Sequence, residues 1–226
     1  MASIFDILGP VMVGPSSSHT AGAVRIGLIG RKLFGRRPDH AKIYLSGSFA
    51  ATGAGHGTDR ALVAGLLGMQ PDDMRIPESY QHAKDAGMQF EIEKKEIRGA
   101  HPNTVQMILE AEGADTLNIQ ACSIGGGRIM VNQIDNIDVN FNAESNTLIV
   151  HNEDKPGHVA QVTAILQQIK VNIATLQLYR DKRGGYAVMV IETDEVIPDM
   201  AIQWLRRLDG IIKVTFFDVN EAIEAE

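Results

Sequence analysis

Histidine, serine and threonine gather in one short stretch near the start of the chain. Residues 14–20 read Gly-Pro-Ser-Ser-Ser-His-Thr and precede a segment whose apolar residues have helical spacing. The first N–H groups of a helix lack intrahelical partners and lie at the positive end of its dipole, so hydroxyls gathered there favour an anion. One serine would be enough for capping alone, which stays the alternative. We therefore predict an anion-binding group of five side chains: Ser16, Ser17, Ser18, His19 and Thr20.

Two further segments combine histidine with glycine or proline and hydroxyls, and each opens a predicted helix. They are residues 53–59, which contain His56, and residues 99–104, which contain His101. His56 stands between glycines, where packing does not require an imidazole, and Pro102 restricts His101 to extended backbone. Imidazole titrates near neutral pH, so three histidines converging at one end of a sheet could transfer protons. His56 and Asp59 have a spacing that suits a metal, but no second pair supports one, and we predict no metal ligands.

Hydrophobic periodicity divides the first two thirds of the chain into alternating elements. The pattern predicts helices over residues 21–34, 59–67 and 105–112, and strands over residues 41–45, 89–97, 116–123 and 128–131. Residues 46–58 are small and rich in glycine, so we expect a flexible segment rather than the interior of an element. The predicted fold class is α+β, with a mixed α/β domain first.

A very polar stretch at residues 142–146 marks the predicted boundary between a domain over residues 1–144 and a second over residues 147–226. The second part reads strand, helix, strand, strand, helix, strand in about seventy residues, which is a ferredoxin-like βαββαβ arrangement. Its predicted helices cover residues 158–169 and 198–208.

Composition excludes several classes of function. The formal net charge of −7 argues against non-specific binding of nucleic acid, which needs a basic face. No apolar run is long enough to cross a membrane, and residues 1–6 lack the basic start of a signal peptide, so we expect a cytoplasmic protein. The single cysteine, Cys122, cannot form an intrachain disulfide or hold an iron–sulfur cluster alone.

The second domain resembles the ACT family of small-molecule regulatory domains. The resemblance rests on Asp-Lys-Pro-Gly-His-Val at residues 154–159 and on Val-Asn-Ile-Ala at residues 171–174. It implies pairing of two copies and binding of an amino acid at the paired face, although an ACT domain can also serve for dimerisation alone. The implied effector-binding residues are Asn152, Asp154, Gly157, His158 and Asn172, and we expect Asn172 to lie opposite the start of the helix that begins at residue 158. Asp154 departs from the asparagine of serine-binding relatives, which puts serine specificity in doubt.

The first domain resembles the β subunit of bacterial iron–sulfur-dependent L-serine dehydratase. Four segments carry the resemblance in order: residues 14–20, 55–59, 101–104 and 123–127. It implies an α subunit as partner, whose cysteines hold a [4Fe-4S] cluster, L-serine as substrate, and no pyridoxal phosphate. A protein of this kind should be inactive without its partner.

The implied reaction is β-elimination. The resemblance implies that cluster iron polarises the leaving hydroxyl while a base removes the Cα proton, and that the product decays to pyruvate and ammonia. It makes His56 and His101 the expected catalytic residues, and it makes Asn103 and the five side chains of residues 16–20 the expected substrate-binding residues. The same domain type also resembles a regulatory domain of some phosphoglycerate dehydrogenases, so a sensor of an amino acid or anion is the alternative.

Overall fold

The computed structural model describes residues 11–220, and these form two compact units divided between Asp135 and Asn136. Residues 1–6, from which we expect no signal peptide, lie outside the described residues. The predicted boundary at residues 144–147 lies further along the chain than this division. The difference arises because strand β6 (Ile137–Phe141) packs against strands β8 and β9 (Ile173–Arg180 and Tyr186–Thr193).

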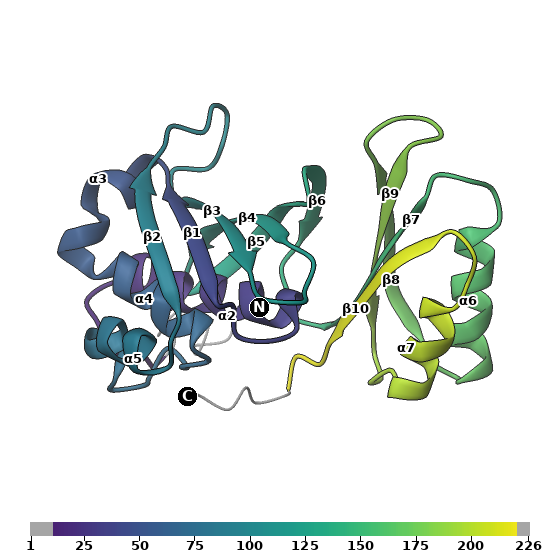
Figure 1. Cartoon of the computed structure of the whole chain (residues 1–226), viewed down its shortest axis with the longest axis horizontal. Coiled ribbons are helices and arrows are strands. Elements are labelled where there is room, and N and C mark those ends of the chain that lie inside the picture. The colour runs from purple at the N-terminus through teal and green to yellow at the C-terminus, as the bar shows by residue number, and fades with distance from the viewer. Residues whose placement is uncertain (1–10, 221–226) are drawn as a thin grey trace, which may run out of the picture. The chain divides into compact units, whose positions relative to one another are not determined.

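The first sheet has the strand order β2-β1-β3-β4-β5-β6 (Figure 1). Strands β1 and β2 pair in parallel, whereas β1 with β3, β3 with β4, and β4 with β5 pair antiparallel. Their bounds are β1 (His40–Leu45), β2 (Gln89–Lys94), β3 (Thr104–Glu110), β4 (Leu117–Gly125) and β5 (Arg128–Ile134). Buried and less buried residues alternate along β1, as the sequence predicts.

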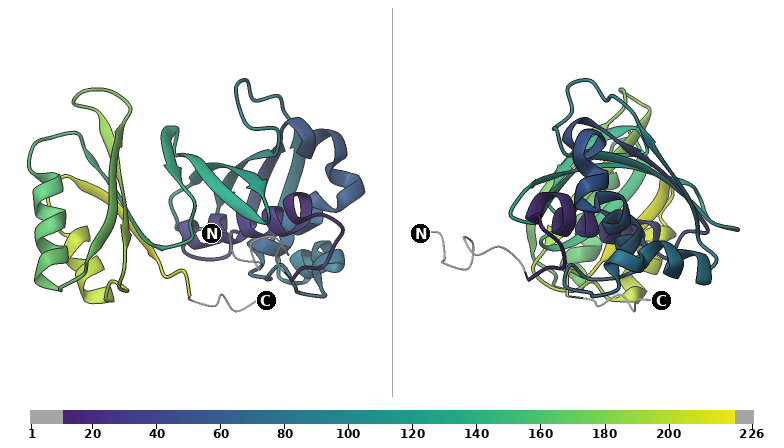
Figure 2. Two further views of the ribbon diagram at one scale, coloured as in Figure 1. Left: turned by 180° about the vertical axis from the view of Figure 1, so that it is seen from behind. Right: turned by 90° about the vertical axis from the view of Figure 1, so that its left-hand side faces the viewer.

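Helices cover one side of this sheet, with α2 lying against β3, β4 and β5 (Figure 2). The helical segments are η1 (Ser17–Ala21), α2 (Gly22–Phe34), α3 (Gly47–His56), α4 (Thr58–Leu66), η2 (Ile76–Glu78) and α5 (Ser79–Asp85). Helices α2 and α4 cross with backbone contact, because a Cβ on Gly27 would lie 2.3 Å from the Leu62 carbonyl oxygen. A Cβ on Gly65 would likewise lie 2.1 Å from the Val24 carbonyl oxygen.

The glycine-rich segment at residues 46–58 is a helix, so the prediction of a flexible segment is wrong. Helix α3 begins after Ser46 and ends at His56, and the next residue, Gly57, has a φ of 67°. Its alanines favour helix, and the side chain of Phe49 is fully buried. Burial of that ring outweighs the low helix propensity of the glycines in the segment.

The helix predicted over residues 105–112 is also wrong, because this segment is the central strand β3. Val105, Met107 and Leu109 are fully buried and pair with β1 and β4 on either side. The neighbouring strands supply backbone partners that a helix would not use, so tertiary context decides the conformation. Helix α5 was not predicted at all.

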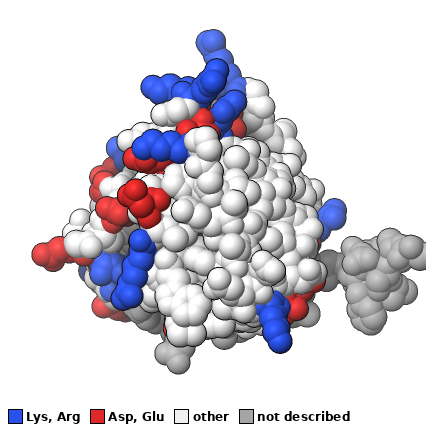
Figure 3. Space-filling model, turned by 90° about the vertical axis from the view of Figure 1, so that its right-hand side faces the viewer, with Lys and Arg blue, Asp and Glu red and all other residues white. Residues whose placement is uncertain are grey.

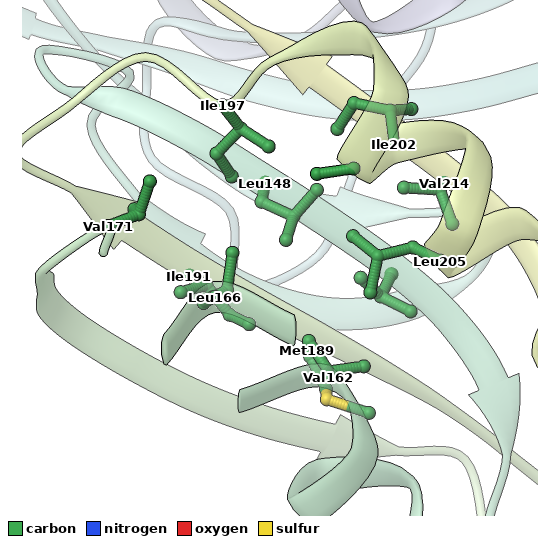
Figure 4. Close-up of a cluster of buried hydrophobic side chains, with 12 residues drawn as sticks. Leu148, Val162, Leu166, Val171, Met189, Ile191, Ile197, Ile202, Leu205 and Val214 are labelled. Atoms are coloured by element: carbon green, nitrogen blue, oxygen red, sulfur yellow. The ribbon is translucent and has the colours of Figure 1, made fainter. Parts of the chain in front are cut away.

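The second unit confirms the βαββαβ order, with sheet order β10-β7-β9-β8. Its other elements are β7 (Asn146–Glu153), α6 (His158–Gln168), α7 (Asp199–Arg206) and β10 (Ile211–Phe217). Both helices pack on one face of the sheet. The core between them contains Leu148, Val162, Leu166, Met189 and Leu205, all fully buried (Figure 4).

Helix α6 contains no lysine, arginine, aspartate or glutamate. Figure 3 looks onto the side where this helix lies in Figure 1 and shows a broad face with few charged side chains. None of the helices within residues 11–220 is both long and apolar enough to cross a membrane.

Candidate active site

The predicted anion-binding stretch folds as a single π-helical turn that leads directly into α2. Ser16 is its N-cap, and its Oγ accepts a hydrogen bond from the His19 N–H at 3.1 Å. The Gly22 N–H donates to the Ser17 carbonyl oxygen five residues earlier, which defines the wide turn. Ser17 and Ser18 lie within the turn and are half-buried. One serine therefore does the capping, and the turn carries the remaining hydroxyls and His19 beside it.

His19 lies against helix α3, which the sequence analysis missed. Its Nε2 lies 3.1 Å from Ser48 Oγ and 3.1 Å from Thr52 Oγ1, one turn apart on that helix. Its ring also meets the buried ring of Phe49 edge-on, with centroids 5.2 Å apart. The imidazole is therefore fixed in position by contacts on both its polar edge and its face.

His19 and His56 form a pair, as the predicted convergence requires. Their ring centroids are 5.0 Å apart. Burial lowers the pKa of His19, and the nearby His56 lowers it further, because two imidazolium charges at this distance repel. The Nδ1 of His56 is buried and has no hydrogen-bond partner within the described protein. The pair thus contains one imidazole that favours the neutral form and one with an unused buried nitrogen.

Thr20 ties the π-helical turn to the end of α3. Its Oγ1 donates to the His56 carbonyl oxygen at 3.3 Å. Its side chain also packs on Gly14, where a Cβ would lie 2.6 Å from the Thr20 methyl carbon. Gly14 has a φ of 130°, which L residues rarely adopt, so both conformation and space require glycine there. Thr20 is 2% exposed and therefore braces the turn rather than facing solvent.

His101 lies in the turn before β3, and the prediction that residues 101–104 open a helix is wrong. Its Nδ1 accepts a hydrogen bond from the Asn103 N–H at 3.2 Å, and its ring is exposed. Asn103 donates through Nδ2 to the Ser123 carbonyl oxygen at 3.4 Å. The Pro102 carbonyl oxygen accepts from the Ser48 N–H at 2.6 Å, so this turn adjoins the start of α3. The turn therefore neighbours the His19 contacts, while no contact between His101 and the histidine pair is seen among residues 11–220.

The end of β4 and the turn that follows it are tied to the start of α2. Ser123 is fully buried, and its Oγ would be 2.2 Å from a Cβ on Gly22. Arg25 donates to the Gly127 carbonyl oxygen at 3.0 Å. The neighbouring Cys122 is 3% exposed, and burial raises the pKa of its thiol. Within residues 11–220 no three His, Cys, Asp or Glu side chains are grouped to hold a metal ion.

Four of the five predicted effector residues gather at one end of the second unit. Asn152 and His158 are buried, and Asn152 Oδ1 and His158 Nε2 have no partner within the described protein. The Gly184 N–H, together with the Arg180 guanidinium, lowers the pKa of Asp154. The carboxylate is therefore ionised and already engaged by the hairpin between β8 and β9.

The predicted position of Asn172 opposite the start of α6 is wrong. Asn172 precedes β8, and its Nδ2 donates to Asp194 Oδ2 at 2.6 Å. The next residue, Ile173, pairs with Thr193 of β9, which pairs in turn with Asn146, the first residue of β7. Asn152 is near the last residue of that strand, and eight residues of β-strand span roughly 23 Å. Because α6 runs the length of the sheet, its two ends cannot both be near Asn172. One copy of this unit therefore cannot bring all five residues to one ligand.

Sequence reasoning missed Ser48, Phe49 and Thr52. A spacing of four residues would place Ser48 and Thr52 on one face of a helix, but the surrounding glycines concealed that helix. This i, i+4 pair of hydroxyls was the one signal available in the sequence.

Each of the two units matches a known protein family. A family model described as serine dehydratase beta chain matches residues 3–89, and a model described as ACT domain matches residues 146–210. A "Probable L-serine dehydratase, beta chain" of Bacillus subtilis (strain 168) is 39% identical over 213 residues, covering 94% of this chain and 96% of the relative. The chain belongs to the family of L-serine dehydratase beta chains.

Two further relatives of this chain carry different names. An "L-serine dehydratase, beta chain" of Peptoniphilus asaccharolyticus is 34% identical over 198 residues, covering 87% of this chain and 89% of the relative. A "D-3-phosphoglycerate dehydrogenase" of Archaeoglobus fulgidus is 25% identical over 220 residues, covering 96% of this chain and 40% of the relative. The match to the serine dehydratase beta chain model includes His19 and His56, whereas His101 and Asn103 lie beyond it.

Proposed function

We propose that this chain is the β subunit of an L-serine dehydratase, which deaminates L-serine to pyruvate and ammonia together with an α subunit. The observation that carries the proposal is the imidazole pair of His19 and His56, within a segment that matches the serine dehydratase beta chain model. β-Elimination needs a base for the Cα proton, and imidazole is the side chain best suited to that task near neutral pH.

His56 is the proposed base. Its neighbour His19 has a lowered pKa and stays neutral, so His19 does not compete with His56 for the proton. The hydroxyls of Ser16, Ser17 and Ser18 are the proposed donors to the substrate carboxylate. His101 is exposed on the adjoining turn and would approach the substrate only within the complex.

A [4Fe-4S] cluster does not fit the residues of this chain alone. Cys122 is its single cysteine, and burial raises the pKa of that thiol, which disfavours the thiolate that a cluster needs. We place any such cluster on cysteines of the α subunit. It would supply Lewis-acid chemistry there, without pyridoxal phosphate.

The test is reconstitution of the complex under anaerobic conditions, followed by measurement of pyruvate formed from L-serine. The variant His56→Ala should lower kcat by about 10² or more. His101→Ala is measured in parallel, and His82→Ala on α5 is the matched control that should retain the wild-type rate. Wild-type-like turnover of His56→Ala would refute the assignment of the base.

The second candidate is a non-catalytic module that senses an amino acid or an anion. The match over 96% of this chain to a protein named as a dehydrogenase favours it, because the same two-unit arrangement then occurs beside a different activity. Calorimetry of the full chain with L-serine, for wild type and Asn172→Ala, tests this candidate. Binding that is lost in the variant, combined with no pyruvate from the reconstituted complex, would replace the first proposal with this one.

A further inference from the structure

The hydrogen bonds around His19 determine which of its ring nitrogens carries the proton. Thr52 Oγ1 donates its single hydrogen to the Ser48 carbonyl oxygen at 2.9 Å, four residues earlier on α3. Its remaining lone pairs can only accept, and they face His19 Nε2 at 3.1 Å. An unprotonated Nε2 would direct its lone pair at a lone pair of Thr52 Oγ1. With the Thr52 hydrogen on the Ser48 carbonyl, we infer that Nε2 is the donor.

The other nitrogen is then unprotonated in neutral His19. Nδ1 lies 3.5 Å from Ser16 Oγ, at the long limit for a hydrogen bond, so its lone pair is only weakly used by the protein. Ser16 Oγ already accepts from the His19 N–H, which leaves its own hydrogen directed toward Nδ1 or toward a ligand. The site therefore presents a hydroxyl and an imidazole lone pair side by side at the N-cap of the turn.

We propose that Thr52 is a positioning residue that fixes the Nε2–H tautomer of His19, so that Nδ1 faces the substrate as a hydrogen-bond acceptor. The chemical group that suits this acceptor is a protonated amine, such as the ammonium group of an amino acid, adjacent to the hydroxyls that suit its carboxylate. This inference rests on the proposed function for the identity of the substrate, but not for the tautomer.

Ser48 cannot replace Thr52 in this role. Its Oγ also lies 3.1 Å from Nε2, but its hydroxyl hydrogen is not committed to another acceptor in the same way. A hydroxyl with a free hydrogen can donate to a bare nitrogen or accept from a protonated one, so it does not select a tautomer. Removing Thr52 Oγ1 should therefore release the tautomer, whereas removing Ser48 Oγ should leave it fixed.

The decisive experiment is ¹⁵N nuclear magnetic resonance of the histidine rings in the full chain alone. The chain has seven histidines, and His19→Gln identifies the His19 signals. At pH 7.5 the wild-type ring should show a protonated Nε2 and a bare Nδ1. Thr52→Val should give a mixture of tautomers, while Thr52→Ser and the matched control Ser48→Ala should keep the wild-type pattern. A protonated Nδ1 in wild type, or an unchanged tautomer in Thr52→Val, would overturn the proposal.

Activity of the reconstituted complex gives the second, separable readout. Thr52→Val should lower kcat/KM for L-serine by about tenfold, the value of one well-placed hydrogen bond, and Thr52→Ser should restore it. An inactive wild-type complex would contradict the proposed function and leave the tautomer result standing. A wild-type kcat/KM in a Thr52→Val protein with mixed tautomers would overturn the functional half of the inference.

Discussion

The crossing of α2 and α4 makes a quantitative prediction about stability. A Cβ at Gly27 would meet backbone atoms of α4 at 2.3 Å, 2.9 Å and 2.9 Å. Real Cβ contacts are never this short, and backbone atoms of a packed helix cannot rotate away. Gly27→Ala must therefore push the two helices apart.

Two opposing effects set the magnitude. Overpacking of a dense core costs about 1–3 kcal/mol, and a rigid backbone contact belongs at the upper end. Alanine regains about 1 kcal/mol over glycine inside a helix. The net destabilisation should be about 2 kcal/mol, or roughly 4–8 °C in Tm for a chain of this size.

Gly30→Ala is the matched control on the same helix. Its Cβ would meet the terminal methyl of Met107 at 2.7 Å, which is the flexible end of a side chain. The same gain in helix propensity then faces a much smaller packing cost, and stability should stay within about 1 kcal/mol of wild type. Thermal unfolding followed by far-ultraviolet circular dichroism compares the two variants. Trp204, the single tryptophan, lies on α7 and monitors the second unit separately by fluorescence. Equal Tm values for Gly27→Ala and Gly30→Ala would refute the inference of a rigid backbone contact.

Three further predictions concern single residues of the first unit. The pKa of folded His19 lies below its usual value of about 6.5, so the unfolded chain binds more protons and the stabilisation present above pH 6.5 should be lost as the pH falls. The urea midpoint of His19→Gln should therefore decrease less than that of the wild type between pH 7.5 and 5.5. The thiol of Cys122 should react with Ellman's reagent at least about tenfold more slowly in the native chain than in urea, because burial raises its pKa. Equal rates would contradict its burial. Gly57→Ala should cost about 1 kcal/mol from its left-handed backbone alone, since no atom lies within 4 Å of the added Cβ. Gly55→Ala within α3 has the same open space and should instead stabilise the chain by up to about 1 kcal/mol in the same urea titration.

The second unit could be predicted from the sequence because its signals are local. Apolar residues alternate along the strands, and a Pro-Gly turn starts α6 abruptly at His158. Each element therefore has the same conformation that its own residues favour. The prediction for Asn172 is wrong because its position is not decided locally: it depends on which end of the sheet each connection reaches.

Strand β3 and helix α3 were misread because non-local contacts decide them. Val105, Ile108 and Leu109 have a spacing that fits one face of a helix as well as a strand, and only pairing with β1 and β4 selects the strand. Residues 47–56 look flexible by composition, and only the burial of Phe49 makes them an ordered helix. The choice of His19 and His56 as candidate site residues needed residue type and local setting alone, whereas the partners of His19 required the structure.

The histidine pair is structurally linked to the crossing of α2 and α4 at Gly27 and Gly65. His19 lies in the turn that precedes α2, and His56 is the last residue of α3, directly before the glycine that precedes α4. At 1.5 Å per residue, Gly27 lies about 8 Å from the start of α2, and Gly65 lies about 10 Å from the start of α4. Helices are stiff over such distances, so the crossing of α2 and α4 helps to hold the turn that carries His19 close to the end of α3 that carries His56. Glycine at both positions allows backbone contact between the two helices, and this close packing keeps His56 beside His19, where it adds to the burial that lowers the His19 pKa.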